Sequence, residues 1–292
     1  MTDLTNLEQR MAALEAASAQ RGKRGSLPIV LAATTCALLT LTCWLLMLLV
    51  QVNTERRAAT QQQQFWLLCQ PGATVESRVE AFLALVEAGN QEWKSARLNR
   101  LPLSQINLDQ VNLNEATFES ADLSGASLVR AQLINANLPT SNLSQATLDR
   151  AQMDGADLLK ANLEQASMQK ILARGISLQQ VTATEVNLNL ADLSDADLRM
   201  ANLTRADLSA TNLAGADLTS AVLEGANLSY TNLSNAILGN VDFADSNWWK
   251  ARGLTADQLD YLASKFAPSE ACDPEWQQDF LVWQETRETR LD

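Results

Sequence analysis

The chain has 292 residues, with 22 Lys and Arg against 34 Asp and Glu, a net charge of −12 and no His. Without His it has no imidazole base, no histidine metal ligand and no Ser-His-Asp or Cys-His nucleophile pair, which excludes most familiar hydrolases. The acidic balance gives no reason to expect nucleic acid as a partner.

Residues 1–26 predict an N-terminal amphipathic helix and a basic flank. Leu4, Leu7, Met11 and Leu14 have the spacing of one helical face, but about two heptads are marginal for a helix alone. Two interpretations stay open: a short solvent-exposed helix leading to a membrane, or a handle for self-association.

Residues 27–50 contain no charged side chain. As a helix they would extend about 36 Å, enough to cross about 30 Å of hydrocarbon. We therefore expect a single transmembrane helix. A cleaved signal peptide is the main alternative, but the apolar run is too long for one and no small-x-small cleavage site follows it.

Positive charges around this span predict its orientation. Four precede it and two follow it: Arg10, Arg21, Lys23 and Arg24, then Arg56 and Arg57. The positive-inside bias favours a cytoplasmic N-terminus, which would make the remainder of the chain periplasmic or lumenal.

Residues 51–95 predict a linker and an N-terminal capping helix. A glutamine run at 61–64 is followed by a helical pattern over 75–88, with Gly89 as its stop. Its expected apolar stripe is Val75, Val79, Phe82, Leu83 and Val86. We expect this helix to close the first turn of the following domain, together with Trp93.

Residues 96–250 have an apolar residue at every fifth position. Counting in fives from Leu98 to Trp248 gives 31 central positions, which we call i, and position i−2 is usually Ala. Leu fills the central position except at Phe118, Met153, Met168, Ala173, Ala183, Phe243 and Trp248. On an α-helix this spacing drifts by about 140° per repeat, and on a flat strand it alternates between faces. Neither element buries such a pattern.

The period fits a chain that bends once in every five residues. Positions i−2 and i then point inward, and the other three point outward. Repeated bends of one hand close into coils that stack at about 4.8 Å, as in a parallel sheet. Asn, Asp, Ser and Thr at i−1 suit the bends because their side chains bond nearby backbone. The pattern predicts an all-β solenoid.

Pentapeptides such as residues 121–125 (ADLSG) and 201–205 (ANLTR) follow the pattern A(D/N)LXX. This pattern resembles the pentapeptide repeat proteins, and the resemblance covers residues 96–250. It implies a right-handed quadrilateral β-helix with four pentapeptides per coil and a cyanobacterial-like origin. It also implies that some relatives mimic duplex DNA and occupy topoisomerases.

The interior pattern departs from Leu at Ala173 and Ala183. Each has a bulky residue at i−2, Ile171 and Val181, which would keep the enclosed volume roughly constant. We interpret this as compensation, although a mild bend or a seam between two halves is an alternative.

Residues 251–292 predict a C-terminal helical cap. Thr255 and Gln258 have the spacing of a capping box, and Leu254 and Leu259 that of a hydrophobic staple. The expected helix extends to about Ser264. In the tail, Trp276, Phe280 and Trp283 share one helical face and are expected to lie over the last coil.

No residue pattern predicts an enzyme, a cofactor or a metal site. Cys36 and Cys43 lie in the expected membrane span, and Cys69 and Cys272 flank the solenoid on opposite sides. A Cys69–Cys272 disulfide would need the tail to fold back along the rod, because the Cα atoms must come within about 7 Å. There is no Gly-rich phosphate loop. The repeat itself places Asp122, Asp157 and similar carboxylates at i−1, where a role in the bend explains them.

The candidate binding residues are Arg130, Arg150 and Lys170. They are twenty residues apart and therefore stack on neighbouring coils about 5 Å apart, where like charges repel. This row could bind an acidic protein patch or anionic headgroups. The alternative is a solubility ladder neutralised by neighbours such as Asp149.

The later coils are acidic: Asp192, Asp195, Asp197, Asp207, Asp217 and Glu224. This charge fits the alternative function of a DNA-mimic inhibitor of a type II topoisomerase, although a membrane anchor argues against it. The sequence predicts a non-enzymatic, membrane-anchored binding or scaffolding protein that presents a rigid rod to an unknown protein partner.

Overall fold

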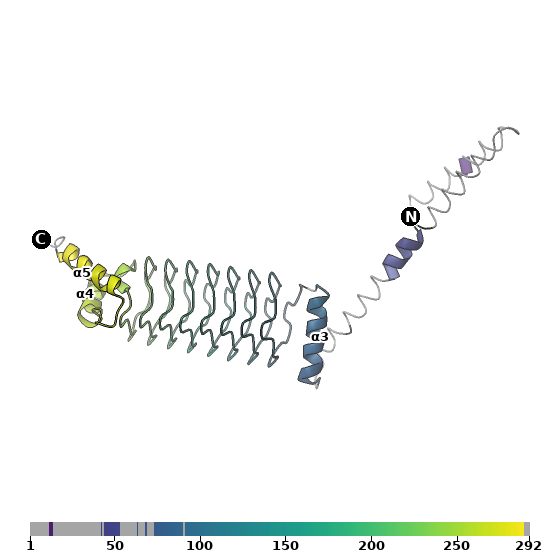
Figure 1. Ribbon diagram of the computed structural model, residues 1–292, viewed down its shortest axis with the longest axis horizontal. Helices are drawn as coiled ribbons and strands as arrows, with labels where there is room; N and C mark the ends of the chain where they lie inside the picture. The colour runs from purple at the N-terminus through teal and green to yellow at the C-terminus, as the bar shows by residue number, and fades with distance from the viewer. Residues whose placement is uncertain are drawn as a thin grey trace. The chain divides into compact units, whose positions relative to one another are not determined.

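The computed structural model describes residues 12, 13, 42, 44–52, 63, 68, 73–89 and 91–288. The chain divides into two units, residues 1–63 and 64–292. The helices of the second unit are α3 (Val75–Glu87), the 3₁₀ helix η1 (Trp248–Lys250), α4 (Ala256–Lys265) and α5 (Pro274–Glu288). Figure 1 shows the stacked coils of this unit between α3 at one end and α4 and α5 at the other.

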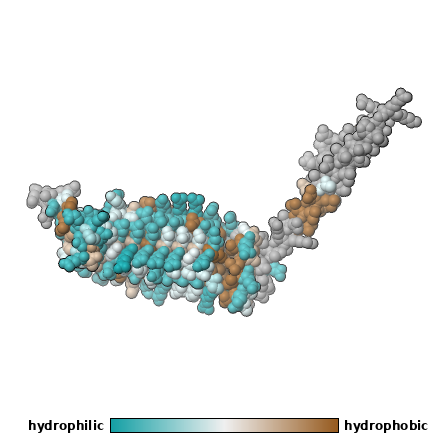
Figure 2. Space-filling model, viewed as in Figure 1, coloured by the Kyte–Doolittle hydropathy of each residue, from teal (hydrophilic) through white to brown (hydrophobic). Residues whose placement is uncertain are grey.

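In the first unit, residues 44–52 are helical and their side chains are exposed. Trp44, Leu46 and Met47 are 55%, 61% and 75% exposed, and Figure 2 shows this stretch as hydrophobic. Within the part of the chain that the structure describes, no helix is both long and apolar enough to cross a bilayer. Most of the expected span 27–50 and of the N-terminal segment 1–26 lies outside the described residues.

Parallel backbone bridges join residues twenty apart along the whole solenoid. They begin with Glu92 and Asn112, include Asp122 with Asn142, and end with Asn232 and Arg252. A repeat of twenty residues confirms four pentapeptides per coil. Each wall holds one bridging residue per coil and not a strand of several residues, because a bend follows within two positions. The strand-like part of each wall is therefore a single residue per coil, which is shorter than expected of an all-β solenoid.

Positions i−2 and i fill the interior, as predicted. Leu123, Leu143, Leu163 and Leu203 are at most 1% exposed, and the alanines two positions before them are equally buried where they occur. Ile171 with Ala173 and Val181 with Ala183 are all buried, which agrees with compensation. Where a hydroxyl replaces Ala, it bonds a backbone carbonyl: the Thr211 hydroxyl donates to Leu188 O at 2.7 Å.

Each bend is a four-residue turn. In most bends the N–H of the next repeat's i−2 residue donates to the carbonyl of residue i, as Ala126 N does to Leu123 O at 3.0 Å. The residue at i+2 has positive φ, for example +63° at Gly125 and +58° at Arg130. That conformation, imposed at every corner, gives the coil its four sides.

Helix α3 covers the first coil. Thr74 is its N-cap, and Gly89 follows it with φ +79°. Phe82 lies 4.5 Å from Trp93 between ring centroids, and both are fully buried. The expected stripe is only partly right, because Ala81, Phe82 and Leu85 face the coil. Val75 and Leu83 are each 41% exposed.

The other end is closed by η1, α4 and α5. Thr255 and Gln258 form the predicted capping box at the start of α4. Trp248 lies 5.8 Å from Phe280 and 5.3 Å from Trp283 between ring centroids. The aromatic face of α5 therefore seals the last coil, as the sequence predicted.

Candidate functional site

Arg130, Arg150 and Lys170 lie on one corner of the solenoid in three successive coils. We call these three residues the basic row. Their backbone N–H groups donate to the next coil at Asp149 O, Gln169 O and Asn189 O, at 2.9, 2.8 and 3.0 Å. All three have φ near +60° and exposed side chains. The stacking therefore brings the three predicted residues together, with backbones about 4.8 Å apart.

Asp149 is not a counterion for this row. Its Oδ1 accepts from the Ser167 hydroxyl at 2.7 Å and from Gln169 N at 3.0 Å. The carboxylate thus bonds the adjacent wall of the next coil. Among the described residues, the ion pairs of the solenoid involve Lys94, Arg174, Arg199 and Arg205 and none of the basic row.

Exposed apolar side chains adjoin the basic row. Leu190 takes the same corner position one coil after Lys170 and is 49% exposed, and Tyr230 takes it two coils further and is 65% exposed. Leu172, on the wall beside Lys170, is 44% exposed. One corner therefore combines three cations with apolar surface.

The carboxylates at i−1 have the bend role that the sequence predicted. Asp122 Oδ1 accepts from Ser124 N at 3.1 Å, and Asp157 Oδ1 accepts from Leu159 N at 3.0 Å. Asn side chains extend this pattern between coils: Asn142 donates to Asp122 at 3.0 Å. These carboxylates therefore satisfy backbone donors at the corners.

The acidic later coils are partly neutralised. Arg199 lies 2.6 Å from Asp197 and 3.9 Å from Asp217, so one guanidinium bridges the stacked carboxylates. A hydrogen bond from Arg199 is the main cause that holds the pKa of Asp197 below its ordinary value. Partial burial raises the pKa of Asp192, but hydrogen bonds from Arg174, Ser194 and Asn212 outweigh this and leave it lowered.

A second group of turn residues was missed from the sequence. Where i−1 is not Asp or Asn, the i+1 residue of the preceding coil can supply the acceptor. Asp109 Oδ1 accepts from Val129 N at 2.9 Å, and Asn114 Oδ1 accepts from Ile134 N at 2.8 Å. The sequence does contain a sign of this contact. An Asp or Asn stands at i+1 in one coil, and the repeat stacked on it in the next coil has no Asp or Asn at i−1.

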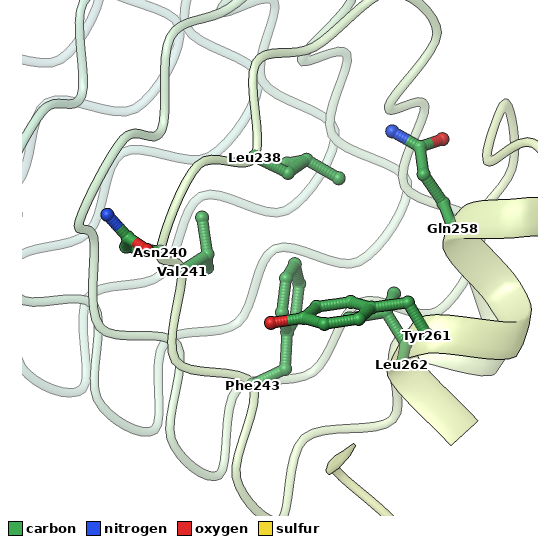
Figure 3. Close-up of a pocket in the computed structure, with 7 residues that line it drawn as sticks. All are labelled: Leu238, Asn240, Val241, Phe243, Gln258, Tyr261 and Leu262. Carbon is green, nitrogen blue, oxygen red and sulfur yellow. The ribbon is translucent and has the colours of Figure 1, made fainter. Parts of the chain in front are cut away.

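A shallow hollow lies between the last coil and α4 (Figure 3). Its volume is about 180 Å³, and Leu238, Phe243 and Leu262 are among its apolar lining residues. Figure 3 shows the Tyr261 side chain extending from α4 toward Phe243. The Tyr261 hydroxyl is bonded to Lys265 Nζ at 3.0 Å, so it does not offer an unpaired polar group.

The structure gives no metal-ligand geometry in its described part, where no three His, Cys, Asp or Glu side chains lie close enough to hold an ion. Cys272 is a buried free thiol. Burial is the main cause that raises its pKa. Cys69 lies outside the described residues.

The stacked coils with twenty-residue bridges define a β-solenoid protein. The family model for pentapeptide repeats matches residues 103–138, 140–169, 174–209 and 201–240. This part of the chain is therefore a pentapeptide-repeat domain, a fold whose members are right-handed quadrilateral β-helices. No curated protein matches the chain.

Several solved structures are similar to the solenoid. HetL, a pentapeptide repeat protein involved in heterocyst differentiation regulation from the cyanobacterium Nostoc sp. strain PCC 7120, is 27% identical over 57% of this chain and 95% of its own, with a TM-score of 0.26. Rfr23 from the cyanobacterium Cyanothece 51142 is 22% identical over 58% and 95%, with a TM-score of 0.30. Full-length QnrB1, a plasmid-mediated fluoroquinolone resistance protein, is 18% identical over 60% and 96%, with a TM-score of 0.34.

Proposed function

We propose that this protein is a single-pass, membrane-anchored scaffold that presents a rigid pentapeptide-repeat rod and has no enzymatic activity. The observation on which the binding role rests is the basic row, three exposed cations stacked on one corner without a counterion among the described residues. A cyanobacterial origin and a periplasmic or lumenal rod remain predictions.

Two features support the membrane attachment. Residues 27–50 contain no charge and suffice for one crossing. The described end of this segment is helical, with Leu45, Leu49 and Val50 about half exposed or more, at 48%, 58% and 61%. A helix that exposes apolar side chains is unfavourable in water and favourable in the hydrocarbon of a membrane.

The rod is suited to presentation because its surface is independent of its interior. Each coil is bonded to its neighbours through the backbone and filled by buried side chains, whereas i+1 and i+2 point outward. Repeat proteins use such surfaces for binding, and the fold alone does not name the partner.

Membrane attachment can be tested by alkaline extraction of native membranes. We expect the chain to stay in the pellet. Leu38→Arg with Leu41→Arg should release it, because each charge costs about 2.5–3.5 kcal/mol at the centre of a span. The matched control, Leu38→Ala with Leu41→Ala, should remain in the pellet. Release of the unchanged protein would contradict the proposal.

Crosslinking in the native membrane tests the binding role. Reversing Arg130, Arg150 and Lys170 to Glu should abolish capture of the molecule that the basic row binds. Capture that survives all three reversals would rule out this surface.

The alternative is a DNA-mimic inhibitor of a type II topoisomerase, which the net charge of −12 favours. The pairing of Arg199 with Asp197 and Asp217 works against it, because it interrupts a continuous acidic surface. A gyrase supercoiling assay decides: inhibition at micromolar protein would support this function over the scaffold.

A further inference from the structure

We propose that the basic row binds anionic lipid headgroups, so that the solenoid lies with this corner against the surface of the membrane to which it is attached. The inference rests on the membrane attachment proposed above and names the partner of the basic row as a lipid surface of negative charge.

The corner of the basic row is the one corner of the described solenoid with consecutive cations. Arg100 and Lys160 share a second corner but are three coils apart. Arg205 is alone on a third corner and faces Glu185 at 3.9 Å. The i+2 positions of the fourth corner, from Ser95 to Asn235, have no cation, and the cations at its i+1 positions, Lys94 and Arg174, are paired with Glu115 and Asp192. A flat negative surface would therefore select one orientation of the rod.

The neighbouring carboxylates are bonded to other groups. Asp149 bonds Ser167 and the backbone of Gln169, and Asp192 on the adjacent wall pairs with Arg174 at 2.7 Å. Among the described residues, none of the three cations forms an ion pair with these carboxylates. A headgroup phosphate or carboxylate can pair with each of them without breaking an existing ion pair.

The exposed apolar residues fit the same partner. Leu172, Leu190 and Tyr230 lie on or beside the corner and are 44%, 49% and 65% exposed. Surfaces that combine Lys and Arg with Leu and aromatic residues bind at the boundary between headgroups and acyl chains. A purely electrostatic contact would not need this apolar extension.

The strength expected of this contact is sufficient for a lipid surface because the solenoid is tethered to the same membrane. Each cation near an anionic leaflet favours the bound state by about fivefold, so three give about a hundredfold. A hundredfold preference would be too small to hold this chain on a membrane without a tether, because its net charge is −12. It is sufficient for a tethered domain, because a short linker holds it at an effective concentration in the millimolar range.

The chain contains a matched pair of lysines for the test. Lys170 belongs to the basic row, and Lys160 takes the same turn position two turns earlier in the chain. Four turns make one coil, so Lys160 lies on the diagonally opposite corner. Both have positive φ, at +59° and +58°, and both side chains are exposed.

The experiment measures the rate at which an amine-reactive ester labels these two lysines, by mass spectrometry, in the full-length chain in nanodiscs. We expect phosphatidylglycerol discs to slow labelling of Lys170 several-fold relative to pure phosphatidylcholine discs and to leave Lys160 unchanged. Molar salt should remove the difference, because it shortens the screening length to about 3 Å.

The variant Arg130→Gln with Arg150→Gln keeps Lys170 as the reporter, and the protection of Lys170 should be lost. Equal labelling of Lys170 in both lipids would overturn the inference and leave the membrane attachment intact. Protection in phosphatidylcholine discs only after a membrane extract is added would replace lipid by a protein partner. Failure of the chain to copurify with either disc would overturn the attachment and, with it, this inference.

Discussion

The side chain of Arg78 in α3 occupies the hydrogen-bonding position of a missing coil by donating to the backbone carbonyl of Arg97 at 2.8 Å. It also donates to Asn99 O at 3.3 Å. One coil later, the equivalent carbonyls of Thr117 and Glu119 accept from the backbone N–H groups of Leu98 and Arg100. One guanidinium thus replaces two backbone donors at the open end of the solenoid.

Arg78→Met should loosen the first coil, because it keeps the apolar stem but leaves both carbonyls without their donors. We expect a loss of about 1.5 kcal/mol, since hydrogen bonds from charged groups contribute about 1.5–3 kcal/mol and these are partly exposed. Hydrogen exchange should quicken in residues 93–112 and stay unchanged in residues 193–212. Arg100→Met, at an exposed corner of the same coil, is the control; an equal effect there would contradict the capping role.

Asn247 performs the corresponding task at the other end. Its side chain accepts from Leu228 N and donates to Asn227 Oδ1 at 2.9 Å and Ser229 Oγ at 3.0 Å, and it is fully buried. Asn247→Ala should cost about 2–4 kcal/mol, because it strands buried polar groups. Thermal unfolding measures the loss. A change below about 0.5 kcal/mol, typical of a surface position, would show that water replaces the amide.

Gly253 is required by a close backbone approach. It has φ +84°, and a Cβ there would lie 2.5 Å from Ser234 N and 2.7 Å from Ser234 Cα. Gly253→Ala should therefore cost more than the left-handed conformation alone, about 3 kcal/mol or more.

Gly175 is the matched control for Gly253. It has φ +62° but nothing within 4 Å of its Cβ position. Gly175→Ala should cost only about 1–2 kcal/mol, the strain of a left-handed Ala. The two melting temperatures separate steric clash from backbone strain, and equal losses would contradict the clash.

The pair of Arg199 and Asp197 predicts a dependence of stability on pH. Because Arg199 holds the folded-state pKa of Asp197 below its ordinary value, the stabilisation is present above the unfolded pKa and is lost as pH falls through the folded pKa. Arg199→Gln should lower the melting temperature slightly at pH 7, since exposed ion pairs contribute little to stability. At a pH below the folded-state pKa of Asp197 the variant and the unchanged protein should melt alike. A difference that persists there would point to packing by the Arg199 stem.

The sequence predicted the repeat but not every contact between coils. The five-residue period sufficed for the interior, because only one backbone path buries a residue such as Leu123 in every repeat. The capping box of Thr255 and Gln258 was predictable because it is local. The sequence did not predict which face of α3 is exposed, because this depends on the contact of Phe82 with Trp93 and on the hydrogen bonds from Arg78 to the first coil.

The basic row was predictable for a different reason. Once the coil length is known, residues twenty apart must stack, so Arg130, Arg150 and Lys170 share a corner. The period could not predict that the Asp149 carboxylate accepts hydrogen bonds from Ser167 and Gln169, because these bonds depend on side-chain rotamers. The sequence left open both a binding surface and a ladder neutralised by Asp149, and the structure shows that Asp149 bonds Ser167 and Gln169 without an ion pair to the row.

The twenty-residue repeat also makes length a separable property of this molecule. The two ends are finished by different residues, Arg78 before the first repeat and Asn247 in the last one, so a whole coil can be inserted or deleted between them without altering either closure. Each such change would alter the reach of the domain by about 4.8 Å. Duplication of gene segments could therefore adjust this protein as a ruler, in fixed increments.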